Sequence, residues 1–204
     1  MIFTNFVEAK ALANPDDMAK HLMTRLPRSI VLVGHMGSGK TNVGRLLAQT
    51  LQLEFVDSDK IIEDVAGISI VDIFDLYGEA EFRRLELREI AKLLDQHPAQ
   101  IISVGGGAFV QPDCHDIIKA KGLSIWLQAR PETLVSRMSN ISSRPLLKDK
   151  DPLHVLKQLS EQRDPYFEKA DLIVNTDGLE LSDSANKVFD HVTQYLKQQS
   201  GSSS

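Results

Sequence analysis

Short apolar runs alternate along the chain with longer segments whose apolar residues recur at helical spacing. Five runs have the length and composition of strands: SIVLVG (29–34), LEFVDSD (53–59), QIISV (100–104), LSIWLQA (123–129) and DLIVNT (171–176). A continuous apolar run such as the first is typical of a strand buried on both faces of a parallel sheet. Because helical segments separate the runs, we expect a three-layer α/β/α fold with a mostly parallel five-stranded sheet.

The segments between the runs carry the signals of helices. Residues 43–51 place valine and leucine at helical spacing directly after the first run. Ser69 followed by Asp72 resembles a capping box, which predicts a helix that precedes a longer one over 79–94. Proline suits the first helical position, so further helices are expected near Pro112, Pro131 and Pro152, with a last one over 183–197. Sheets of this kind bind ligands at the carboxyl ends of their strands, so we expect the chemistry there.

Two flanking regions lie outside this pattern. Residues 1–28 form an N-terminal extension in which NPDD at 14–17 resembles the start of a helix. We expect the extension to be partly helical and either to pack on the domain or to form a dimer contact. Residues 29–198 then make up one domain, and the tail 199–204, rich in serine, is expected to be disordered.

The composition narrows the classes of partner. Lys and Arg number 23 against 28 Asp and Glu, and the net charge of −5 argues against a nucleic-acid binder or a protein of anionic membrane surfaces. Cys114 is the only cysteine, so the sequence offers no internal disulfide, zinc cluster or CxxC pair. No apolar run approaches the length of a membrane span. We expect a cytoplasmic protein that binds neither nucleic acid nor membrane, and a monomer, with a dimer as the alternative.

The sequence GHMGSGKT, from Gly34 to Thr41, satisfies the pattern G-x-x-x-x-G-K-[ST]. It lies between an apolar strand and an amphipathic helix, which is the context that a phosphate-binding loop requires. Its glycines allow backbone amides to point inward around phosphate oxygens at the positive end of the helix dipole. Lys40 is placed to reach the β- and γ-phosphates, and the hydroxyl of Thr41 is suited to Mg²⁺. The segment predicts a site for a nucleoside triphosphate.

A pair of carboxylates follows the second strand in the sequence VDSD. Asp57 and Asp59 are two residues apart at the carboxyl end of this strand, so we expect them to share one of its faces. A carboxylate at this point is suited either to supporting hydrated Mg²⁺ or to accepting the proton of an attacking hydroxyl group. The alternative is that Asp59 caps a helix that begins at KIIEDV.

Six segments along the chain form a set with a defined order and spacing: GHMGSGKT, VDSD, GEAEFRRLE, ISVGGGA, SRPLL and RDPYFEKA. In this order and spacing they resemble the shikimate kinase family, over about residues 29–197. The resemblance implies the nucleoside monophosphate kinase-like fold of P-loop kinases and an enzyme dependent on ATP and Mg²⁺. It also implies transfer of the γ-phosphate of ATP to the 3-hydroxyl of shikimate, which gives shikimate 3-phosphate and ADP in the pathway to chorismate and the aromatic amino acids.

The resemblance assigns roles to the acidic residues and to one arginine. Asp59 corresponds to the residue that orients the attacking hydroxyl and acts as base, and Asp57 lies by the metal. Shikimate carries one carboxylate, and the guanidinium of Arg83 can donate two N–H bonds to such a group, a geometry that lysine cannot reproduce. Phe82 would form a wall of the pocket, and Glu86, one turn later, would hold the arginine in place. The alternative for Arg83 is a solvated charge on a helix.

Three consecutive glycines, Gly105 to Gly107, follow the third strand. Glycine loses more conformational entropy on folding than other residues, so a ligand that approaches bare backbone is a reason to keep such a run. In the resembling family the run lines the shikimate site, with Gly106 and Gly107 closest. Arg163 fits a second contact to the substrate carboxylate. The alternative is a flexible turn into the next helix.

A polar stretch between SRMSN and DPLHVL is longer than most connections in such sheets, and we interpret residues 139–152 as a mobile lid that excludes water. Arg144 in this lid would close onto the phosphates and stabilise charge in the transition state. Arg137 corresponds to the residue that stacks on adenine in relatives, with an ordinary surface arginine as the alternative. Asn42 departs from the family, where a second hydroxyl residue commonly follows the threonine. The expected nucleotide contacts are Gly37, Ser38, Gly39, Lys40, Thr41, Asn42, Arg137 and Arg144.

Other functions are weighed against this one. A kinase for gluconate or for a nucleoside monophosphate shares the P-loop, but Arg83, Arg163 and the glycine run favour shikimate. A GTP-dependent switch is suggested only by DVAG at 64–67, which no strand precedes, and NTDG lacks the lysine of a guanine-binding NKxD motif. A catalytically silent, regulatory relative is disfavoured because the expected functional set is complete. That set comprises Lys40, Asp59, Arg83, Arg144 and Arg163.

Overall fold

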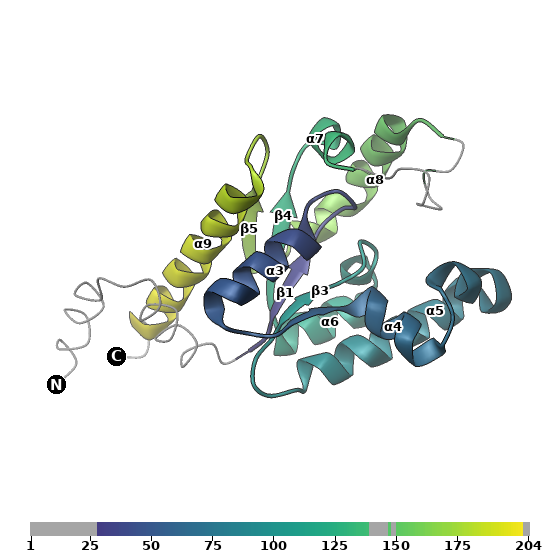
Figure 1. Cartoon of the computed structure of the whole chain (residues 1–204), viewed down its shortest axis with the longest axis horizontal. Helices are drawn as coiled ribbons and strands as arrows, with labels where there is room; N and C mark the ends of the chain where they lie inside the picture. Colours follow the sequence, from purple (N-terminus) through teal and green to yellow (C-terminus); the bar gives the residue numbers. More distant parts are fainter. Residues whose placement is uncertain (1–27, 139–146, 148–149, 202–204) are drawn as a thin grey trace.

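The core of the protein is a sheet of five parallel strands in the order β2-β3-β1-β4-β5 (Figure 1). This computed structural model describes residues 28–138, 147 and 150–201. The strands are β1 (Ile30–Val33), β2 (Phe55–Asp57), β3 (Ile101–Ser103), β4 (Leu123–Gln128) and β5 (Leu172–Asn175). Each expected strand is present with shorter ends, and all pairings are parallel because helices connect the strands.

The described helices agree with the sequence signals for a start at Ile70, Pro112, Pro131 and Pro152, whereas those that begin at Ser58 and Ala108 were not predicted. They are α3 (Lys40–Leu51), α4 (Ser58–Ala66), α5 (Ile70–Leu94), η1 (Ala108–Val110), α6 (Pro112–Lys121), α7 (Pro131–Ser136), α8 (Pro152–Phe167) and α9 (Leu181–Gly201). Proline opens α6, α7 and α8 as predicted, because its missing N–H has no partner in the first turn. Helix α9 continues past 197 to Gly201, so it includes residues 199–201 that we expected in the tail.

Two apolar layers cover the sheet. Helices α3 and α9 lie side by side on one face, where they bury Ile30 and Leu32 of β1 (Figure 1). Val31 and Val33 point to the opposite face and pack against residues of α5, α6 and α8. The central strand β1 is thus buried on both sides, because successive side chains of a strand alternate between faces. The predicted three-layer α/β/α fold is confirmed.

The chain turns from β2 directly into α4 at Asp57. The side chain of this residue accepts a hydrogen bond of 3.2 Å from the backbone N–H of Asp59, so Asp57 is the N-cap of the helix. Asp59 therefore lies in the first turn of α4, and our expectation that both aspartates share a strand face is wrong. The reason is local: a capping aspartate satisfies an N–H group of the first helical turn and so ends the strand. The capping role that we considered for Asp59 belongs to Asp57.

Helix α5 consists of two helical segments that meet at Gly78. Ser69 caps the first segment by accepting a hydrogen bond of 3.1 Å from the N–H of Asp72, as the sequence predicts. Gly78 has φ 81° and ψ 173°, a conformation that favours glycine and separates the two segments at the expected place. Ile62, Ile73 and Phe82 form a small core at this end of the molecule.

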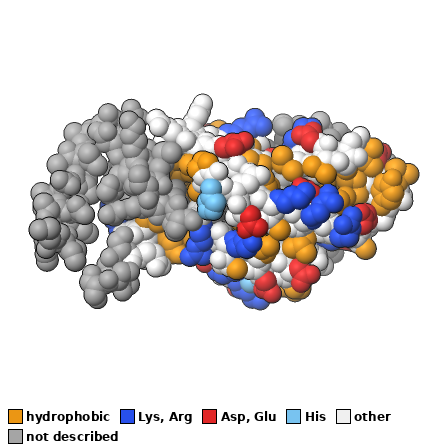
Figure 2. Space-filling model, turned by 90° about the horizontal axis from the view of Figure 1, so that it is seen from below, with side chains coloured by type: hydrophobic (Ala, Val, Ile, Leu, Met, Phe, Trp, Pro, Cys, Tyr) orange, Lys and Arg blue, Asp and Glu red, His pale blue; other side chains and the backbone are white. Residues whose placement is uncertain are grey.

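Hydrophobic side chains also gather on the surface at the end formed by α4 and α5 (Figure 2). The exposed ones include Val65, Val71, Phe74, Leu76 and Tyr77. Among the helices that the structure describes, none has the length and apolarity to cross a membrane. The helix expected near residues 14–17, most of the expected lid and Arg144 lie outside the described residues.

Candidate active site

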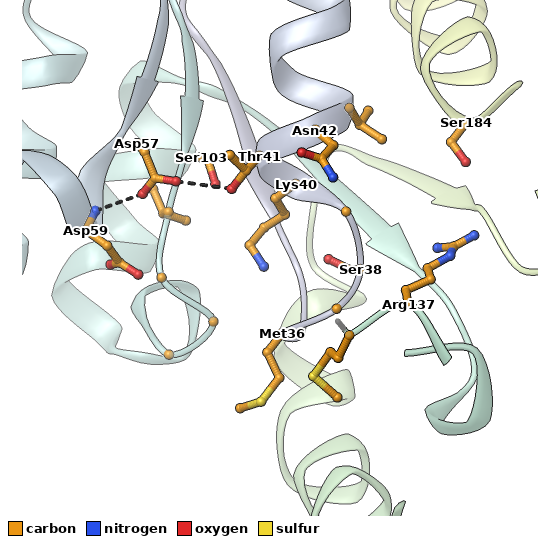
Figure 3. A pocket seen from close by; sticks show the side chains of 18 of the residues that line it. Met36, Ser38, Lys40, Thr41, Asn42, Asp57, Asp59, Ser103, Arg137 and Ser184 are labelled. Atoms are coloured by element: carbon orange, nitrogen blue, oxygen red, sulfur yellow. Dashed lines mark hydrogen bonds between the residues drawn. The ribbon is translucent and has the colours of Figure 1, made fainter. Parts of the chain in front are cut away.

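A cavity of about 880 Å³ opens at the carboxyl ends of the central strands. Its lining includes every described residue that the sequence analysis assigned to the site: Gly37, Ser38, Gly39, Lys40, Thr41, Asn42, Asp57, Asp59, Phe82, Arg83, Gly105, Gly106, Gly107, Arg137 and Arg163. Figure 3 shows Lys40 reaching into the middle of this space, with Asp59 on one side and Arg137 on the other. The cavity therefore has one end at Asp59 and a separate end at Arg137, with the phosphate-binding loop between them.

The phosphate-binding loop owes its shape to glycines. Positive φ angles of 137°, 79° and 91° occur at Gly34, Gly37 and Gly39. A Cβ at Gly37 would lie 2.5 Å from the carbonyl oxygen of Leu134, so a side chain cannot be accommodated there without movement. The ammonium of Lys40 donates hydrogen bonds of 2.9 Å to the carbonyl oxygens of Gly34 and His35, and this places its charge across the loop.

Thr41 and Asp57 form a hydroxyl–carboxylate pair between α3 and the end of β2. Oγ1 of Thr41 donates a hydrogen bond of 3.1 Å to Oδ2 of Asp57, which caps α4 with its other oxygen (Figure 3). Among the described residues no group of three or more His, Cys, Asp and Glu side chains is arranged to hold a metal ion. Mg²⁺ needs no such group, because it keeps several waters and binds one or two protein oxygens together with substrate phosphates. The pair fits an ion of this kind.

Asp59 is directed toward the cavity with one oxygen unengaged. Its Oδ1 is buried and has no hydrogen-bond partner among the described residues. Burial raises the pKa of Asp59 above its usual value, the negative charge of Asp57 raises it further, and Lys40 opposes the shift. Asp59 thus brings a carboxylate of raised pKa to the cavity wall.

Arg83 is fixed by two carboxylates of its own helix. Nη1 donates a hydrogen bond of 2.6 Å to Glu86, and Nη2 donates one of 3.1 Å to Glu79. The contact with Glu86 was predicted, whereas Glu79, one turn earlier, was missed although its i, i+4 spacing is a signal for such a pair. Burial raises the pKa of Glu86, and the Arg83 charge opposes the shift. Phe82 is 5% exposed, and its ring centroid lies 5.1 Å from the guanidinium carbon.

Each glycine of the run meets a different functional group. A Cβ at Gly105 would lie 2.9 Å from Oδ1 of Asp59, and a Cβ at Gly107 would lie 2.9 Å from Nη2 of Arg83. At Gly106 the nearest atom would be the carbonyl oxygen of Gly34 in the phosphate-binding loop, at 3.4 Å. The run is thus a close junction of backbone and charged side chains rather than an open turn.

Arg163 joins the glycine run from helix α8. Its Nη1 donates a hydrogen bond of 3.0 Å to the carbonyl oxygen of Gly106. Burial lowers the pKa of Arg163, and the positive charge of Arg83 lowers it further. The charge of Arg83 thus disfavours the charge of Arg163, and an anion between the two guanidinium groups would relieve this repulsion.

Arg137 lies at the other end of the cavity, where it caps the carboxyl end of α7. Its Nη2 donates hydrogen bonds to the carbonyl oxygens of Thr176 and Leu179, at 2.6 and 2.9 Å, in the turn after β5. The guanidinium plane is therefore anchored beside that turn rather than free in solvent. Asn42 is exposed at the cavity wall.

Two further residues of the phosphate-binding region were not identified from sequence. His35 is buried, and its Nε2 lies 2.7 Å from Oδ1 of Asp164 in α8. No local sequence pattern could have predicted this pair, because 129 positions separate the two residues along the chain.

Comparison with known proteins agrees with this geometry. The shikimate kinase family model matches residues 36–197. The shikimate kinase of Mesorhizobium japonicum is 44% identical over 163 residues, which cover 79% of this chain and 80% of that protein. The structure of the shikimate kinase of Acinetobacter baumannii in complex with shikimate superposes with a TM-score of 0.80 at 35% identity, and the match covers 87% of this chain and 98% of that one.

A gluconokinase from Sinorhizobium meliloti shares the fold, with a TM-score of 0.60 over 88% of this chain and 99% of that one. Its identity of 19% supports a common architecture and nothing more specific. The gluconate alternative is therefore not favoured. By family model, sequence identity and structure, the chain belongs to the shikimate kinase family.

Proposed function

We propose that the cavity binds ATP over the phosphate-binding loop and shikimate between Asp59, Arg83, Arg163 and the glycine run. Phosphoryl transfer within the family then proceeds from the γ-phosphate of ATP to the 3-hydroxyl of shikimate. The observation that carries this assignment is the convergence of two arginines on Gly106 and Gly107, beside the loop that holds Lys40.

The two guanidinium groups are the proposed site of the shikimate carboxylate. Nη1 of Arg163 is bonded to the backbone at Gly106, and Nη2 of Arg83 lies against Gly107. A carboxylate between them would accept charge-assisted hydrogen bonds, which are stronger than neutral ones. The pKa of Arg163 is lowered first by burial and then by repulsion from Arg83, and the carboxylate would relieve this repulsion. The absence of side chains on the glycines lets the ring of the substrate approach the backbone.

Asp59 is the proposed base. In the reaction the oxygen of the 3-hydroxyl forms a bond to the γ-phosphorus, the bond from that phosphorus to the β,γ-bridging oxygen breaks, and ADP departs. The proton of the hydroxyl passes to the carboxylate of Asp59. Support comes from the position of Asp59 in the cavity wall and from burial, which raises the pKa of Asp59 and makes it a better proton acceptor than an exposed aspartate.

Lys40, Thr41 and Asp57 are the proposed groups on the nucleotide side. Lys40 would bind the β- and γ-phosphates as a point charge. Thr41 and, through water, Asp57 would hold Mg²⁺, which when bound neutralises charge on the phosphates. Arg137 would stack on the adenine beside the turn after β5. The roles of Arg144 and of the lid, which lie mostly outside the described residues, stay predictions, as do the cytoplasmic location and the monomeric state.

One coupled assay tests the proposal. The purified protein is given ATP and Mg²⁺ with shikimate, quinate, gluconate or CMP in parallel, and release of ADP is followed. Fast, acceptor-dependent release is expected with shikimate alone. Equal or faster release with gluconate or CMP would contradict the assignment.

A further inference from the structure

His35 occupies the second position of the phosphate-binding loop, where its side chain turns away from the nucleotide side and into the protein. The residue is 3% exposed, and its ring packs edge-on against Phe167 with 5.0 Å between ring centroids. Nε2 lies 2.7 Å from Oδ1 of Asp164. The loop that holds phosphate in the proposed function is therefore bonded directly to helix α8.

The backbone of His35 serves the loop at the same time. Its carbonyl oxygen accepts hydrogen bonds from the ammonium of Lys40, at 2.9 Å, and from the N–H of Ser38, at 3.2 Å. Displacement of His35 would therefore move the groups around the proposed phosphate site.

Asp164 directly follows Arg163, and this connects the pair to the proposed shikimate site. Arg163 is bonded to the carbonyl oxygen of Gly106 at 3.0 Å, and the ideal Cβ position of Gly106 is 3.4 Å from the carbonyl oxygen of Gly34. Two hydrogen bonds thus connect the phosphate-binding loop through α8 to the glycine run, and the close approach of Gly106 to Gly34 completes the circuit.

Burial and the charges around the imidazole determine its protonation. Asp164 and Arg163 face it from α8, and Lys40 faces it from α3. Burial lowers the pKa of His35, with Lys40 and Arg163 acting in the same direction and Asp164 opposing them. The neutral imidazole then donates its Nε2–H to the carboxylate, which only accepts. A leucine would fill this space without the cost of burying an imidazole, so packing alone does not account for the pair.

We propose that the His35–Asp164 hydrogen bond is a positioning contact that holds the nucleotide loop and Arg163 in register, so that the bound nucleotide and the shikimate carboxylate are correctly spaced for phosphoryl transfer. The inference rests on the proposed function. It predicts that nucleotide and shikimate influence each other's binding through this hydrogen bond, because each ligand would order one end of the same circuit.

The test compares wild type with His35→Leu, Asp164→Ala, the double variant and His35→Gln, whose amide retains a donor. Turnover is measured, together with the Kd of shikimate by calorimetry with and without ADP and Mg²⁺. The ratio of the two Kd values reports the coupling, which a merely structural residue would leave unchanged. His115→Leu is the matched control, because His115 pairs with Asp116 at 3.2 Å on α6 and does not line the cavity.

His35→Leu and Asp164→Ala are each expected to lower kcat about tenfold, as a small misplacement of reacting groups does. In both variants the ratio of Kd values should move toward one. The double variant should be no worse than either single variant, because all three lack the same contact. His35→Gln should keep kcat within about threefold of wild type, and His115→Leu should match wild type.

A folded His35→Leu variant with wild-type turnover and an unchanged ratio of the two shikimate Kd values would overturn the inference. If His35→Leu does not fold, Asp164→Ala and His35→Gln decide. A lowered kcat in Asp164→Ala with a retained kcat in His35→Gln supports the contact, and equal kcat values in the two variants overturn it. A wild-type protein that releases no ADP with shikimate contradicts the proposed function itself. An active wild type with insensitive variants contradicts only the positioning role.

Discussion

Glu86 accepts a hydrogen bond of 2.6 Å from Nη1 of Arg83, one helical turn away, and its side chain is 1% exposed against 23% for the arginine. The buried carboxylate therefore anchors the guanidinium at Nη1, and Nη2 of the same group lies beside Gly107. A planar guanidinium held by Glu86 at Nη1 and by Glu79 at Nε and Nη2 is preorganised to bind an anion with its remaining N–H donors. This pair explains how a charged side chain keeps a fixed direction at the cavity.

Arg83→Lys tests that geometry, because lysine keeps the charge and loses the fork. Shikimate binding is expected to weaken by about 2–3 kcal/mol, or roughly 30- to 150-fold, while the apparent affinity for ATP changes little. Calorimetric titration with shikimate gives the value. Arg84→Lys is the matched control, since Arg84 is exposed and paired with Glu81 outside the cavity. Equal shikimate affinity in both variants would remove Arg83 from the site.

Asp59→Asn should lower kcat by about 10²- to 10⁴-fold with intact ATP binding, because the amide cannot take up the proton of the hydroxyl. Burial and Asp57 raise the pKa of Asp59, so ionising this carboxylate at neutral pH costs the folded state free energy. The free energy of unfolding of the variant should therefore not fall, which urea denaturation checks. Asp64→Asn on the exposed side of α4 should leave kcat unchanged. Near-normal turnover in Asp59→Asn would refute the role.

Gly107→Ala introduces a Cβ that would lie 2.9 Å from Nη2 of Arg83. The guanidinium must move, so we expect weaker shikimate binding by at least about tenfold, with the fold retained. Gly67→Ala provides the contrast, because Gly67 has φ +72° and open space around it. That variant should lose about 1 kcal/mol of stability through backbone strain and bind shikimate normally. Thermal unfolding and calorimetry separate the two effects.

The stability of the protein should depend on the ionisation of His35. Its pKa in the folded state is lowered from 6.5, mainly by burial. As pH falls through 6.5 toward the folded pKa, the unfolded chain takes up the proton first, so the free energy of unfolding decreases. Urea denaturation at pH values between about 5 and 8 should show a steeper loss for wild type than for His35→Leu. Parallel curves for the two proteins would show that His35 does not titrate in this way.

Chelation of Mg²⁺ with EDTA should abolish ADP release, and added Mg²⁺ should restore it, because phosphate charge would otherwise oppose attack. Thr41→Ser should retain most of the activity and Thr41→Val should require more Mg²⁺, since only serine keeps the hydroxyl that pairs with Asp57. A Mg²⁺ requirement that is the same in both variants would show that Thr41 is not a ligand.

Much of the fold was predictable because its signals are local. The apolar run at 29–34, the prolines that open three helices and the break at Gly78 each act within a few residues, and each appears in the structure where it was expected. The prediction for Asp59 was wrong because here, too, a local signal decides the structure. A strand pattern continues through VDSD, but the side chain of Asp57 caps α4 and turns the chain into a helix two residues earlier.

The amino-acid pattern established the five strands, the phosphate-binding loop, the six family motifs and the types of side chain at the candidate site. It did not establish which of these side chains would meet. That His35 bonds to Asp164, and that Gly105, Gly106 and Gly107 face three different groups, follows from the strand order and from how α5 and α8 pack beside the sheet. Contacts between residues 129 positions apart leave no periodic trace in the chain, because they arise from the summed packing of the two apolar layers and not from any neighbouring residues.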